Sequence, residues 1–207
     1  MNSLKTLMGV STLVLGASAA SASISSVTGS TNWLLLPPPS AATGFLMGPQ
    51  AYAWDEQQNV FTTGVYCDML NNPGNSGSPV PGTIIGAFDS HMIHFQLPTG
   101  GGAGGSVTFS GQIIGVMFVG LSLDNTDATF GSFGTVYPTG DPGRGLNLFS
   151  SFSINANVLT YQFATLAPSK DIIELRVLTH PVPAPGAMAL LGLGGIVSGR
   201  RRRGARF

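Results

Sequence analysis

The residues best suited to chemistry lie at positions 89–94, where a carboxylate, a hydroxyl and two imidazoles come from Asp89, Ser90, His91 and His94. A carboxylate-held imidazole can activate a serine, and imidazoles near a carboxylate can bind zinc. On a strand, however, neighbouring side chains diverge, and residues three apart point to opposite faces. We therefore expect one histidine packed inside and the other on the surface. No catalytic residue and no zinc site is predicted.

A second set of candidate ligands is Asp124-Asn125-Thr126-Asp127, whose oxygens suit a hard cation such as calcium. The spacing does not match an EF-hand loop. Asp and Asn also bond their own backbone in β-turns, and we interpret the segment as such a turn. Asp124 and Asp127 remain the alternative calcium ligands. No cofactor is expected.

Short runs rich in Val, Ile, Phe and Thr lie between turn signals about every ten residues, which predicts an all-β domain. The expected strands are residues 60–66, 83–88, 91–97, 106–109, 112–119, 148–154, 158–164 and 172–178. Eight strands with long loops favour a single antiparallel β-sandwich or jelly-roll-like domain. No helical stripe of comparable length is visible.

Several connections are also predicted. Residues 155–157 read as a hairpin turn because Asn tolerates positive φ, and the glycine-rich residues 98–105 read as a flexible connector. Residues 33–36 suit an edge strand followed by three prolines. Asp55 and Glu56 are expected on the solvated surface.

Charge is unevenly distributed along the 207 residues. Between residues 23 and 181, three positive residues stand against nine negative ones, a net charge of −6. Such a body lacks the basic footprint that nucleic acid requires. Cys67 is the only cysteine, so it can form no disulfide within the chain, and we expect it to be buried, with pairing between chains as the alternative.

The first 22 residues resemble a secretory signal peptide. Lys5 precedes an apolar run at 7–17 that is too short to span a bilayer, and small residues end at Ala22. We expect signal peptidase to cut after Ala22, which leaves residues 23–181 as a β-rich ectodomain.

The last 26 residues have three parts. We expect a break in the preceding structure at Val182, Pro183, Ala184, Pro185 and Gly186 and an apolar helix at residues 187–199. A basic cluster at 200–206 follows, beginning with Arg200, Arg201, Arg202 and Arg203. The helix from 185 to 199 would be about 22 Å long, so the arginines must snorkel for it to span a membrane. Such a cluster favours the cytoplasmic side and places the body outside.

This order of proline motif, apolar helix and arginines resembles the PEP-CTERM sorting signal of Gram-negative bacteria. The resemblance implies that an exosortase-like enzyme recognises the tail at 182–207 and cuts near the proline motif. One departure is Ala184, which replaces the acidic residue usual between the prolines. Residues 89–95, 111–116, 135–138 and 144–146 also resemble an uncharacterised ectodomain common in that class. A plain C-terminal membrane anchor is the alternative.

Together these features predict a noncatalytic, exported cell-surface or extracellular-matrix protein, sorted through its tail and associated with exopolysaccharide or biofilm. It would be anchored in the membrane by the C-terminal helix, then displayed or released. One alternative is a carbohydrate- or calcium-binding surface module, whose sugar platform would use aromatic residues. These are Trp33, Tyr52, Trp54, Tyr66 and Tyr137. An envelope hydrolase built on Asp89, Ser90 and His91 is the other alternative.

Overall fold

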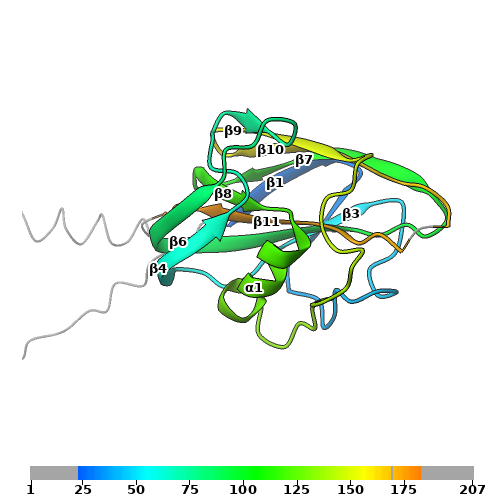
Figure 1. Ribbon diagram of the computed structural model, residues 1–207, viewed down its shortest axis with the longest axis horizontal. Coiled ribbons are helices and arrows are strands. Elements are labelled where there is room, and N and C mark those ends of the chain that lie inside the picture. Colours follow the sequence, from blue (N-terminus) through cyan, green and yellow to red (C-terminus); the bar gives the residue numbers. More distant parts are fainter. Residues whose placement is uncertain (1–22, 169, 183–207) are drawn as a thin grey trace, which may run out of the picture.

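The computed structural model describes residues 23–168 and 170–182, which form two facing β-sheets (Figure 1). The first sheet has five strands in the order β1-β7-β10-β9-β5. Their bounds are β1 Ile24–Gly29, β5 Gly74–Asn75, β7 Gly101–Phe109, β9 Ser151–Asn155 and β10 Val158–Thr165. All of its strand pairs are antiparallel.

The second sheet has the order β2-β3-β6-β11-β8, with β4 pairing to β6 beyond that path. Its strands are β2 Thr31–Leu34, β3 Ala51–Asp55, β4 Val60–Cys67, β6 Gly82–Phe95, β8 Ile113–Met117 and β11 Ile173–Thr179. The edge strand predicted around Trp33 is present as β2. It pairs parallel to β3, so the sheet is mixed and not wholly antiparallel as predicted.

The core lies between the two sheets and takes residues from both. Phe109, Leu159 and Phe163 of the first sheet pack with Ile93 and Leu175 of the second, all with 3% or less of their surface exposed. Alternating burial along β9 and β10 matches one face packed and one face solvated. The predicted all-β class is therefore confirmed.

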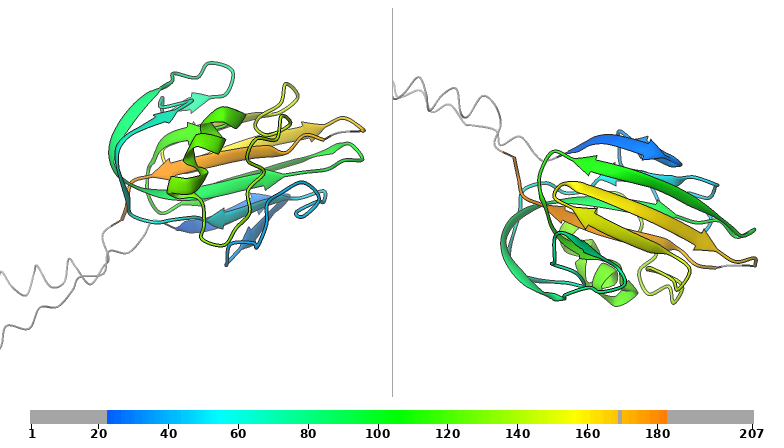
Figure 2. Two further views of the ribbon diagram at one scale, coloured as in Figure 1. Left: turned by 60° about the horizontal axis from the view of Figure 1, so that its bottom comes forward. Right: turned by 90° about the horizontal axis from the view of Figure 1, so that it is seen from above.

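Strand β6 is much longer than predicted, because residues 82–95 form one continuous strand where two were expected. Its second half, from Asp89, pairs with β11, while its first half pairs only with β4. We call the two-stranded segment formed by Val60–Cys67 and residues 82–88 the β4–β6 arm. The arm curves away from the sheet beside α1 (Figure 2).

One helix was missed. Residues Gly120–Phe130 form α1, so the β-turn predicted at 124–127 is wrong. Its buried residues are Leu123, Thr126 and Phe130, which give only a narrow apolar stripe. The polar segment was interpreted as a turn because the partners of its carboxylates lie in distant parts of the chain and cannot be recognised in the local sequence.

The glycine-rich segment was also predicted wrongly, because Gly101–Phe109 is a central strand, β7, between β1 and β10. A Cβ at Gly104 would lie 2.6 Å from Oε1 of Gln162. The missing side chains therefore make room for residues of the neighbouring strand to lie across β7. Composition alone indicated a flexible connector, whereas in the fold the glycines of β7 allow the neighbouring strand to approach closely.

The hairpin predicted at 155–157 is confirmed, since Asn155 pairs with Val158. Its positive φ of 53° falls on Ala156 and not on an asparagine. Asn72 holds the turn from outside: its Oδ1 accepts the Ala156 N–H, and its Nδ2 donates to the Ala156 and Ile113 carbonyls.

The predicted signal peptide at 1–22 lies outside the described residues, as do Pro183 to Gly186, the predicted helix at 187–199 and the arginines. Val182 is the last residue described. Within residues 23–168 and 170–182, no helix has the length and apolar character needed to cross a membrane.

Candidate functional site

The two histidines lie on opposite faces of β6, as predicted. His91 faces the core between the sheets, where its ring is 4.6 Å from that of Phe109, and His94 faces the side covered by α1 and the loops. Both side chains are fully buried, so the expectation that one would be on the surface is wrong. The loops and helix that cover this face could not be read from strand alternation.

The side chains of the proposed catalytic segment have partners elsewhere. His91 contacts Asp55 through Nδ1 at 2.7 Å and Thr179 through Nε2 at 3.0 Å. Ser90 donates its hydroxyl to Oε2 of Glu56 at 2.6 Å, and Asp89 accepts the Asn59 N–H at 2.5 Å. Ser90 is therefore held by a carboxylate acceptor and not by an imidazole base.

Asp124 and Asp127 are brought together on α1, and a guanidinium lies between them. Arg144 Nη1 donates to Asp124 at 2.7 Å and to Asp127 at 2.6 Å, and its Nη2 donates to Asp127 at 2.9 Å. The Thr139 hydroxyl also donates to Oδ2 of Asp127, and the Gly140 N–H donates to Oδ2 of Asp124. The oxygens proposed to bind calcium are thus occupied by an arginine and the 139–140 loop.

A second arginine lies deeper, on β11. Arg176 is fully buried and donates from Nε and Nη2 to the two carboxylate oxygens of Glu56, at 2.7 and 2.9 Å. It also donates to Asp127, to the Thr126 hydroxyl and to the Leu123 carbonyl. All five N–H groups of the guanidinium are used, which fastens the sheet to α1.

The remaining contacts connect these pairs. Arg144 Nε donates to Glu174 at 2.7 Å, and the other oxygen of Glu174 lies 2.9 Å from Nδ1 of His94. Tyr137 donates its hydroxyl to Glu56, and its ring lies beside both guanidinium groups. We call the six charged residues the buried ion-pair cluster: Glu56, Asp124, Asp127, Arg144, Glu174 and Arg176.

Opposite charges favour the ionised forms of Asp127 and Glu174. Burial alone would raise the pKa of Asp127, but the hydrogen bond from Arg144 and the charges of both arginines lower it overall. Burial likewise opposes ionisation of Glu174, and His94 and Arg144 lower its pKa. The carboxylates in turn raise the pKa of both arginines despite burial. The arrangement suits fixed charge, not proton transfer near neutral pH.

Helix α1 is held at its start by a residue from β4's end. Asp68 accepts the N–H groups of Phe118 and Val119 at 2.7 and 2.9 Å and the Ser122 hydroxyl at 2.7 Å. Val119 makes no side-chain cap, and the N–H groups that Asp68 accepts precede Gly120, so the carboxylate fixes the entry into α1 and, near the helix N-terminus, complements its dipole.

Sequence reasoning assigned Glu56 to the surface and gave no role to Arg144, Glu174 or Arg176. Glu56 is buried, so that prediction is wrong. One signal was available: Arg144 and Arg176 are two of only three cations between residues 23 and 181. Rare arginines in an acidic, apolar body indicate internal pairing, because Arg suits buried, bidentate contacts with carboxylates.

Cys67 is fully buried, as predicted, and unpaired within the described chain. Burial and the charge of Asp68 raise the pKa of its thiol to about 12. Gly115 gives it room, since a Cβ there would lie 2.6 Å from Sγ. The thiol therefore packs as an apolar group.

The aromatic residues proposed as a sugar platform are dispersed. Trp54 is fully buried, Tyr137 belongs with the arginines, and Tyr66 lies exposed on the β4–β6 arm. A shallow depression of about 670 Å³ lies elsewhere, beside β9 and β10. Hydroxyl and amide side chains line it, including Asn75, Asn147 and Gln162.

Among the described residues, no group of three or more His, Cys, Asp or Glu side chains is placed to hold a metal ion. Comparison with family models, with curated proteins and with solved structures found no match to this chain.

Proposed function

We propose that the protein is a noncatalytic, exported cell-surface or extracellular-matrix protein, delivered through its N-terminal signal and sorted through its C-terminal tail. The observation that carries this proposal is the order of the tail: the proline motif at 182–186, the apolar segment at 187–199 and the arginine cluster from Arg200. An exosortase-like enzyme and signal peptidase are the processing partners, and exopolysaccharide is the expected surrounding.

The described body supports a structural role in two ways. Its buried and partly buried charged residues pair with one another, and Arg176 joins Glu56, beside β3, to Asp127 on α1. Its net charge of −6 keeps it soluble outside the cell without favouring nucleic acid. Because its charged side chains bond one another, the folded body is suited to display at the cell surface.

The proposal is tested in the native cells by comparing the full chain with a variant in which Arg200 to Arg203 are replaced by alanine. The full chain should be found at the surface or in the matrix. The variant should lose cytoplasmic retention of the tail and be processed or distributed differently, because the cluster sets tail orientation. Identical distribution and processing of the two would contradict a sorting role for the tail.

A second candidate function, binding of a neutral glycan, is favoured by the depression beside β9 and β10. Its uncharged lining of amides and hydroxyls suits sugar hydroxyl groups, and Leu148 at its rim is 99% exposed. Titration with soluble exopolysaccharide from the same cells tests this. Binding should be weakened by Gln162→Ala together with Asn147→Ala; equal binding by wild type and variant would remove the assignment.

A further inference from the structure

The β4–β6 arm carries an exposed apolar face. Phe61 is 69% exposed, Tyr66 53% and Ile85 70%. Phe61 lies opposite Ala87 and Tyr66 opposite Thr83, on the side of the ladder away from buried Cys67 and Phe88. We call Phe61, Tyr66 and Ile85 the arm face.

The arm is also free of charge. Neither residues 60–67 nor residues 80–88 contain an Asp, Glu, Lys or Arg, although the body carries twelve such residues. Charged side chains are the usual protection of an exposed strand pair in water. Their absence, with two aromatic rings and an isoleucine outward, is typical of side chains placed at a membrane–water interface.

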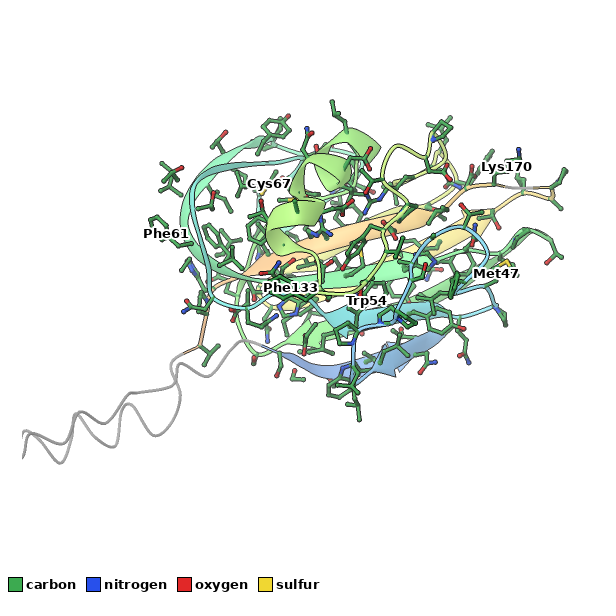
Figure 3. The ribbon with its side chains drawn as sticks, turned by 90° about the horizontal axis from the view of Figure 1, so that it is seen from below. Met47, Trp54, Phe61, Cys67, Phe133 and Lys170 are labelled. Carbon is green, nitrogen blue, oxygen red and sulfur yellow. The ribbon has the colours of Figure 1, made fainter. Side chains whose placement is uncertain are left out.

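The arm face begins at Phe61, where the chain leaves the body, and continues along the curved arm to Tyr66, which lies beside Leu121 of α1. Strand β11 ends at Thr179, which pairs with Asp89, and the arm begins at the next residue of β6, Phe88. Figure 3 places Phe61 at the end of the molecule where β11 ends, and Lys170 at the opposite end. The described chain stops three residues after β11, at Val182.

The length of the following chain limits how far the body can lie from a membrane. Ala187 begins the apolar segment, and five residue steps from Val182 reach at most about 18 Å. A body tethered so closely must present one end to the bilayer. The arm face is the apolar part of that end.

We propose that the arm face is a membrane-contact site, on which Phe61, Tyr66 and Ile85 enter the lipid interface while the tail at 187–199 is inserted. This inference rests on the proposed membrane tether. Because the body is acidic and the arm uncharged, the contact needs no anionic lipid, and phosphatidylcholine is sufficient. A second copy is a poorer occupant, because three side chains of about 150–250 Å² each fall short of the roughly 800 Å² that each partner buries in a stable complex.

The test uses the full chain in phosphatidylcholine vesicles that contain lipids with a nitroxide on the acyl chain. An environment-sensitive fluorophore is attached at Ile85→Cys, and at Lys170→Cys as the control. Cys67 is buried and stays unlabelled. Flotation of the vesicles reports insertion of the tail, while quenching of the fluorophore reports contact at the labelled position.

The expected result is flotation of both proteins, with quenching at residue 85 several-fold stronger than at residue 170. Phe61→Glu should reduce the quenching at residue 85, whereas Leu166→Glu, an exposed leucine near Lys170, should not. Flotation with equal, weak quenching at both positions would support the membrane tether but contradict the contact site on the arm face. Failure to float would contradict both the tether and the contact site. Shielding at residue 85 that depends on protein concentration and not on lipid would assign the face to a second copy.

Discussion

Replacing Arg176 by methionine should strongly destabilise the fold. The substitution keeps an apolar stem but removes five hydrogen bonds, two of them to Glu56 and one to Asp127. Glu56 would then be a buried carboxylate held only by the hydroxyls of Ser90 and Tyr137. Breaking a buried ion pair by removing one partner costs about 3–5 kcal/mol, out of a total stability of about 5–15 kcal/mol.

The assay is urea unfolding of the full chain in a nonionic detergent, followed by tryptophan emission from buried Trp54 and partly buried Trp33. Arg176→Met, Glu56→Gln and the double variant complete a cycle, and Lys170→Met, on the exposed far end, should leave stability unchanged. Once Glu56 is neutral, losing Arg176 leaves less unpaired charge. The double variant should therefore be more stable than the two single losses predict, by about 1–3 kcal/mol. Additive losses would refute the reasoning that Glu56 and Arg176 stabilise each other as a buried ion pair.

Three further predictions concern the same region. Asp68→Ala should destabilise the protein by about 1–3 kcal/mol and loosen the start of α1 in hydrogen exchange, with Asp68→Asn recovering part of the loss; exchange unchanged in both would contradict the role of Asp68 in fixing the entry into α1. The Cys67 thiol should react with a maleimide only as fast as the protein opens, whereas the thiol of Ile85→Cys should react at once; fast reaction of both would contradict burial. Because the folded pKa values of Asp127 and Glu174 lie below their ordinary 3.8 and 4.5, their stabilisation is complete above about pH 5 and is lost as pH falls through those lowered values. Asp127→Asn should flatten this acid dependence of the unfolding free energy, and an unchanged slope would contradict it.

The sequence was most informative where structure is local. The hairpin at 155–157 and the alternation along residues 158–164 could be predicted, because turn chemistry and a two-residue period leave a direct pattern. The separation of His91 and His94 onto opposite faces followed from the same period. Helix α1 could not be predicted this way, since distant Asp68 fixes the residues that lead into it and distant Arg144 pairs with the carboxylates on its polar face.

The contacts within the buried ion-pair cluster could not be predicted from the sequence, for a related reason. Glu56 follows β3, Asp127 lies on α1, and Arg176 lies on β11, so the contacts join segments up to 120 residues apart. The sequence around each of these residues predicts a solvent-exposed side chain, because a charge is normally exposed unless it is paired. Only the chain path shows that these charges meet.

We propose that the two ends of the chain are an export signal and a sorting signal, and that the cell exports the body at residues 23–181. Intact-mass measurement of the protein from native cells and their medium reads both ends together. A mass that begins near Ser23 and ends near Pro183 is the result we predict, because it corresponds to removal of the signal peptide and of the sorting tail. A mass that includes residues 1–22, or that keeps the arginines in every fraction, would contradict delivery by the two signals.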